Sequence, residues 1–213
     1  MKQDNEKNIV SFSTTASQEV DQDTLSITFS ADDSMKDASQ LQSALATKLK
    51  AALDIARAAA VPKLVEVRSG NFQIYPTYDD EGEVNGYNGS VDMIVSGTDM
   101  ATIAGLTGLI TTMAVASLSH SVSDDLRDNV VNNLTLRVIQ MWRNRATEYV
   151  SAFNSNGYTL VNASISETNN SSYMRKAVAS SAYIGGASGV PVEQEPGRET
   201  LSASVSGSIQ LNR

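Results

Sequence analysis

The chain has 213 residues, of which 41% are hydrophobic and 19% are charged, and these proportions are ordinary for a soluble globular protein. Sixteen basic and twenty-four acidic residues give a net charge of −8, which argues against nucleic acid as a partner because phosphate binding needs a basic surface. The chain has no cysteine, so disulfides, thiolate metal sites and cysteine nucleophiles are excluded.

The length suits one domain over residues 1–213, and two lobes at about 1–97 and 98–213 are the alternative division. No apolar run approaches the roughly 20 residues that span a bilayer, so no transmembrane segment is expected. The first ten residues, MKQDNEKNIV, are polar and lack the apolar centre of a signal peptide. We therefore expect either a cytoplasmic protein or one whose signal peptide has been removed.

Alternation of apolar and polar residues predicts two strands near the start of the chain. Val10, Phe12 and Ala16 form one apolar series, and a second series runs from Leu25 to Ala31. The stretch between them, residues 17–23, is polar and predicts a turn. We therefore expect the two strands to form a first hairpin.

The spacing changes over residues 34–60, where leucine and alanine recur every three or four positions and predict an amphipathic helix. Ser34 and Asp37 form a candidate capping box at its start. Pro62 follows its end, because proline cannot continue a helix.

Residues 71–95 have the pattern of a β-hairpin, with two alternating arms and a polar, glycine-containing turn at 79–86. Pro76 lies in the first arm and cannot donate a hydrogen bond to a neighbouring strand. That arm is therefore predicted to be an edge strand or to carry a bulge.

Residues 98–113 predict a shorter helix capped by Thr98 or Asp99, and residues 116–122 predict a strand. The longest helix is expected over residues 123–153. Its apolar positions lie broadly on one face, which is typical of a helix that packs against a sheet.

The last part of the chain holds a strand over 161–165, a long irregular loop near 169–199 and a strand over 201–211. The terminal strand alternates so regularly that it is expected to pair inside a sheet or with another subunit. The whole order is β-β-α-β-β-α-β-α-β-β. It predicts an α+β fold, with mixed, largely antiparallel sheets and helices packed on one face.

This element order and five short motifs resemble the SIMPL-domain family, also called DUF541, of bacterial envelope proteins. The motifs are FQIYPTY at 72–78 with Gly86-Tyr87, Asn156-Gly157-Tyr158, Pro191-Val192, Pro196-Gly197 and the strand 202–205. The long helix departs from the family pattern, because it is richer in Asn, Arg and aromatic residues than the alanine-rich version.

The resemblance implies a periplasmic or secreted protein with poorly defined biochemistry. Some relatives are linked to oxidative-stress defence, and some assemble into ring-like or channel-like oligomers. The family brings no agreed catalytic residues, so none is carried over to this chain, and no cofactor or metal ligand is assigned.

His120 is the only histidine, and its position in the alternation places it on the apolar face with Leu118 and Val122. A general base needs an orienting partner and a nearby nucleophile, and no motif supplies them. We therefore interpret His120 as a structural or interface residue.

The acidic cluster Asp79, Asp80, Glu81 and Glu83 could offer oxygen ligands, but it lacks the spacing of a calcium loop and is interpreted as a solvated turn. Trp142 and Tyr149 are interpreted as core residues. Gly185-Gly186 with Gly189 lacks the strand–turn–helix setting of a phosphate loop, and is interpreted as a linker.

The sequence thus favours a non-enzymatic envelope protein that forms homo-oligomers, with the terminal strand and the loop before it as the association elements. The alternative reading of that strand is that it completes the monomer's own sheet. The alternative function is a binding module that takes an unidentified small molecule or protein in the groove between sheet and helices. An enzyme is the third possibility.

Overall fold

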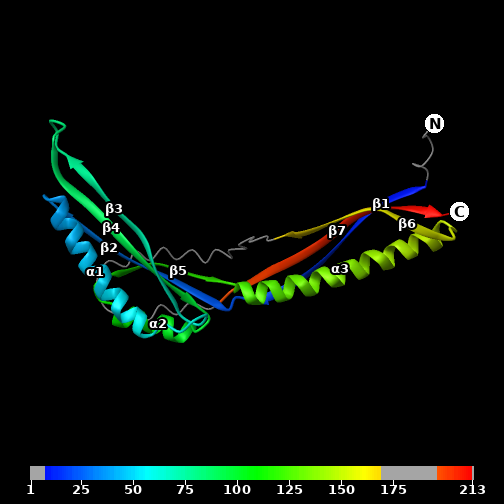
Figure 1. Cartoon of the computed structure of the whole chain (residues 1–213), viewed down its shortest axis with the longest axis horizontal. Coiled ribbons are helices and arrows are strands. Elements are labelled where there is room, and N and C mark those ends of the chain that lie inside the picture. Colours follow the sequence, from blue (N-terminus) through cyan, green and yellow to red (C-terminus); the bar gives the residue numbers. More distant parts are fainter. Residues whose placement is uncertain (1–7, 169–195, 213) are drawn as a thin grey trace. The chain divides into compact units, whose positions relative to one another are not determined.

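The computed structural model describes residues 8–168 and 196–212, and within these ranges three helices and seven strands follow the predicted order (Figure 1). The α+β class with antiparallel sheets is confirmed. The elements form two compact units, between which the chain passes near residues 21, 123 and 197. In these units the first strand lies with the end of the chain, and residues 98–123 lie with the elements that precede them.

One unit is a four-stranded antiparallel sheet with two helices. The sheet has the order β3-β4-β2-β5, so β3 and β5 are its edges. Its elements are β2 (Thr24–Met35), α1 (Ala38–Ala58), β3 (Glu66–Tyr78), β4 (Val84–Gly97), α2 (Met100–Leu109) and β5 (Ala114–Ser121). Alternate residues of β2 and β4 face the helices and form the core with them, among them Ile27, Phe29, Met93, Val95, Leu41, Leu45 and Ile103.

The predicted second hairpin is confirmed. β3 and β4 pair from Glu66 opposite Ser96 to Tyr78 opposite Val84, and Pro76 lies in the edge strand, as its missing donor requires. The turn is shorter than expected, because β4 already begins at Val84.

The helix starts show one correct and one wrong prediction. Asp99 caps α2 as expected, since its carboxylate accepts the Thr102 amide at 3.1 Å and the Thr102 hydroxyl at 2.7 Å. The hydrogen bond from the Thr102 hydroxyl is the larger cause, and the one from the Thr102 amide the smaller, of a lowered pKa of Asp99. Ser34 does not cap α1, because it still belongs to β2 and bonds Asn88, whereas Asp37 accepts the Gln40 amide at 2.8 Å.

The other unit is a three-stranded antiparallel sheet with one long helix along one face (Figure 1). Its elements are β1 (Ile9–Asp21), α3 (Asp124–Ala152), β6 (Gly157–Thr168) and β7 (Arg198–Asn212). The predicted first hairpin is wrong, because β1 pairs with β7 whereas β2 pairs with β4 and β5. Residues 17–21 continue β1 instead of turning, since the apolar alternation that includes Val20 extends beside β7.

β7 is the central strand of this sheet. It pairs with β1 from Ile9 opposite Gln210 to Asp21 opposite Arg198, and with β6 along its other side. The terminal strand therefore completes its own sheet, and it does not offer a free edge for association. The loop expected near 169–199 lies outside the described residues, except that its last residues belong to β7 and the short segment before it.

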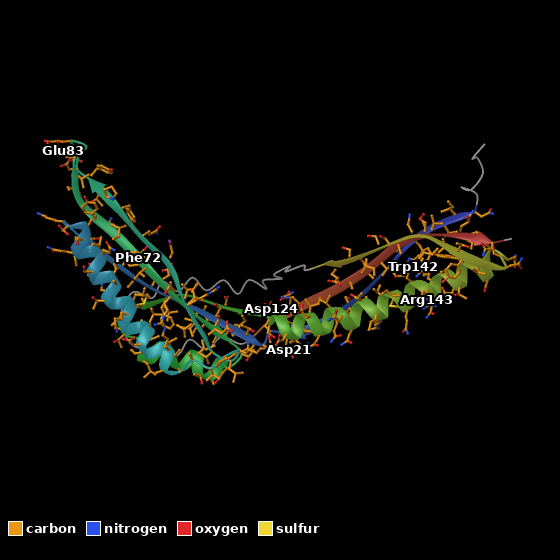
Figure 2. All side chains as sticks on the ribbon, viewed as in Figure 1. Asp21, Phe72, Glu83, Asp124, Trp142 and Arg143 are labelled. Atoms are coloured by element: carbon orange, nitrogen blue, oxygen red, sulfur yellow. The ribbon has the colours of Figure 1, made fainter. Side chains whose placement is uncertain are left out.

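Aromatic side chains fill the space between α3 and this sheet. Phe12 of β1 stacks on Trp142 with ring centroids 4.7 Å apart, and Tyr149 meets Phe12 edge-on at 5.0 Å. Figure 2 shows Trp142 on the part of α3 that runs beside the strands. Gly207 of β7 lies against the indole, because a Cβ at Gly207 would be 3.1 Å from Trp142 Cζ2.

Replacement of Gly97 by alanine is expected to lower the free energy of unfolding by about 2–4 kcal/mol. Gly97 has a φ of 155°, and an added Cβ would overlap the Leu64 carbonyl oxygen and lie 2.6 Å from the Leu64 carbonyl carbon. Urea unfolding followed by circular dichroism measures the change.

The matched control is Gly105→Ala in α2 of the same unit, where an added Cβ meets no atom within 4 Å. That variant is expected to raise the free energy of unfolding by about 0.5–1 kcal/mol, because alanine favours helix. Equal stability of the two variants would contradict the close packing at Gly97.

Candidate functional site

The sheet β1-β7-β6 carries neutral polar side chains in register on the face turned away from α3. Residues directly opposite each other share a face, so the strand pairing aligns these side chains in rows across three strands. The rows are Ser11, Ser208 and Asn162; Ser13, Ser206 and Ser164; and Thr15, Ser204 and Ser166. The Ser11 and Ser208 hydroxyls lie 2.8 Å apart, and the three rows contain no charged side chain.

A shallow hollow of about 510 Å³ lies over the first two rows. The residues around it are Ser11, Phe12, Ser13, Asn162, Ala163, Ser164, Ser206, Gly207 and Ser208. The hollow presents the hydroxyl and amide groups of its serines and Asn162 together with apolar carbon atoms of the same strands. These groups can form hydrogen bonds with a neutral polar molecule. The residues around the hollow include no acidic, basic or histidine side chain that could serve as a general acid or base.

The charged side chains of β1 and β7 gather where β7 begins. Arg127 of α3 contacts the Glu199 carboxylate with both guanidinium nitrogens, at 3.0 and 3.3 Å, and both side chains are largely buried. Arg198 contacts Asp21 at 2.8 Å and Glu19 at 3.6 Å, and the bond to Asp21 raises the pKa of Arg198. The charges are therefore separated from the neutral rows.

β6 forms one edge of this sheet. Among the described residues it pairs with β7 alone, and its first ten residues, 157–166, carry no charge. Leu160, Val161 and Ile165 are 54%, 49% and 50% exposed, although Leu160 and Ile165 lie opposite buried residues of β7. An uncharged strand edge with half-exposed apolar side chains is a surface suited to pairing with another strand.

Sequence reasoning missed this edge, because it placed association on residues 201–211 instead. Both strands alternate, and alternation does not show which of them is central. The signal present in the sequence is the apolar content of residues 160–165 without a neighbouring charge.

The acidic cluster is part of the hairpin turn, as predicted. The Asp79 carboxylate accepts the amides of Glu81 at 3.1 Å and Glu83 at 2.9 Å, and the cluster is exposed. Figure 2 shows Glu83 at the tip of the β3–β4 hairpin. Within 8–168 and 196–212 no group of acidic or histidine side chains is arranged to hold a metal ion.

His120 lies on edge strand β5, opposite the buried Leu25. Both ring nitrogens are buried, and in the described part of the chain neither has a hydrogen-bond partner. The ring therefore packs on the apolar face of the sheet, as its position in the alternation predicts. No orienting carboxylate or nucleophile is brought to it among those residues.

Trp142 is buried between α3 and the strands, which confirms its assignment to the core. Tyr149 lies on the same helix as Trp142 and contacts Phe12 of β1, so it belongs to the same aromatic cluster. The predicted glycine linker, Gly185-Gly186 with Gly189, lies outside the described residues.

Comparison with known proteins gives a family match, and no curated protein matches the chain. None of the helices in the described ranges is both long and apolar enough to cross a membrane. The match is the model of SIMPL, a protein family of unknown function (DUF541), which covers residues 10–209. These residues include all ten elements of the two units except Ile9 of β1 and the last three residues of β7, and the chain therefore belongs to the SIMPL family.

Proposed function

We propose that this protein is a non-enzymatic component of the bacterial cell envelope that acts through homo-oligomeric assembly. The observation that carries the proposal is the sheet β1-β7-β6, which α3 covers on one face only. Its other face is neutral and hydroxylated, and its β6 edge presents half-exposed apolar side chains. A periplasmic or secreted location and a part in oxidative-stress defence rest on the family resemblance.

Charge distribution supports contact between copies at this sheet. Each chain has a net charge of −8, so two copies repel each other at most orientations. The neutral rows and the uncharged part of β6 form a surface where close approach brings no acidic side chains together. Assembly through this surface therefore avoids repulsion between acidic side chains.

The hollow on the same face favours a second candidate function, a binding module. Its volume of about 510 Å³ is in the usual range for small-molecule sites, and its polar groups suit an uncharged, hydrogen-bonding ligand. The hollow lies on the open face of the sheet, whereas the sequence suggested a groove between sheet and helices.

The purified chain is expected to form a particle whose mass is a multiple of 22.7 kDa at micromolar concentration. Light scattering coupled to size-exclusion chromatography measures this mass directly. Because the proposed contact is not based on charge, the mass should persist at 0.5 M salt, where Coulomb interactions are screened within about 5 Å. A 22.7 kDa particle across the micromolar range would contradict assembly and favour the binding module.

His120→Leu tests the packing role that the non-enzymatic proposal gives to this residue. Leucine removes two buried ring nitrogens, so the free energy of unfolding should be unchanged or higher by up to about 1 kcal/mol. Chemical unfolding of the variant and the wild type gives the difference.

Leu25→Ala is the control, because Leu25 is the buried neighbour of His120 and its truncation should lower the free energy of unfolding by about 2–5 kcal/mol. If His120→Leu lowered the free energy of unfolding as much as this control does, the imidazole would be making polar interactions. That result would contradict a role limited to packing.

A further inference from the structure

We propose that the β6 edge pairs antiparallel with the β6 edge of a second copy, so that the two three-stranded sheets become one six-stranded sheet. This inference rests on the proposed function and names the surface through which assembly occurs. Pairing of a strand with its own copy about a two-fold axis is an isologous contact, which closes at two copies and leaves the rest of each chain free.

Among the described edge strands, β6 is the one best suited to meet its own copy. β3 carries Glu66, Arg68 and Pro76, residues that guard a strand edge through charge or a missing donor. β1 has an uncharged run as long as that of β6, residues 9–18, but within it Ile9 alone is an exposed large apolar residue. β5 is uncharged but has only eight residues. β6 has twelve residues and no charge before Glu167.

The half-exposed residues of β6 are complementary to themselves in one register. In an antiparallel pair of identical strands, the two-fold axis passes through a residue that then lies opposite its own copy. An axis at Ala163 places Ile165 opposite Val161 of the second copy. The same axis places Asn162 opposite Ser164. Between residues 161 and 165, apolar side chains therefore meet apolar ones and polar side chains meet polar ones.

The bulge in β6 fits this register. The pairing with β7 shifts between Leu160 and Asn162, so Val161 is the extra residue and Leu160 keeps its place on the α3 side of the sheet. Each Ile165 then lies near both Leu160 and Val161 of the other copy, and all three lose exposed apolar area. The hydroxyl rows of the two copies become continuous on the opposite face.

Cysteine substitution tests the register, because the chain has no cysteine of its own. Ala163 is exposed, and directly opposite residues have α-carbons about 4.5–5.5 Å apart, within the range of a disulfide. Under mild oxidation Ala163→Cys is expected to form a covalent dimer on non-reducing electrophoresis. Thr159→Cys on the same strand is the control, since its two copies would be more than about 20 Å apart and should remain monomeric.

Charge substitution tests the contribution of the edge to assembly. In Ala163→Lys the two ammonium groups would lie opposite each other, which should raise the dissociation constant about tenfold or more. Ala163→Gln has a similar length without charge, and should assemble within about threefold of the wild type. Circular dichroism of both variants confirms that the fold is retained, because residue 163 is exposed.

The results separate this inference from the proposed function. A wild type that assembles, together with no Ala163→Cys dimer and normal assembly of Ala163→Lys, would overturn the β6 contact while homo-oligomerisation stands. A monomeric wild type would overturn both. Equal disulfide yields in Ala163→Cys and Thr159→Cys would indicate random collision, and would also overturn the inference.

Discussion

The pairing of β1 with β7 is the constraint on which the rest of the smaller sheet depends. It joins the two ends of the described chain over thirteen residue pairs, from Ile9 opposite Gln210 to Asp21 opposite Arg198. Such a contact between distant segments must overcome a large loop-closure entropy, and it is expected to form late in folding. Once it forms, β7 lies between β1 and β6, and this position decides which strand edges are left free.

The same pairing sorts the side chains by chemistry. The alternation of β7 directs Leu201, Val205 and Ile209 toward α3, and it directs the serines between them to the open face. The charged side chains of β1 and β7 lie where β7 begins, and there Arg127 of α3 and Arg198 meet acidic partners. The result is a neutral face and a neutral edge on a chain that is acidic as a whole, and these are the surfaces proposed for contact between copies.

Local signals predicted most of the fold. The β3–β4 hairpin, the Asp99 cap and the element order follow from periodicity, turn residues and caps, all of which act over a few positions. The first hairpin and the role of the terminal strand were wrong, because the partner of a strand is a non-local choice that alternation does not encode. Ser34 was wrongly predicted to cap α1, because β2 continues to Met35, beyond the apolar series that ends at Ala31.

The candidate site was less predictable for the same reason. The serines of residues 202–208 are visible in the sequence, but their alignment with Ser11, Ser13 and Asn162 exists only through the register of three strands. Within the described residues, β6 is an edge strand because β7 is central. Family membership adds the fold and leaves the biochemistry open, so these surfaces carry the functional argument.

Hydrogen exchange measured by mass spectrometry at low and high protein concentration tests the central claim most directly, because it reports strand pairing along the whole chain. Amides of residues 198–212 should exchange slowly at both concentrations, since β7 is paired on both sides. Amides of residues 157–168 should exchange faster in the dilute protein and become protected when copies associate. Concentration-independent exchange in residues 157–168, or fast exchange in residues 198–212, would contradict the account.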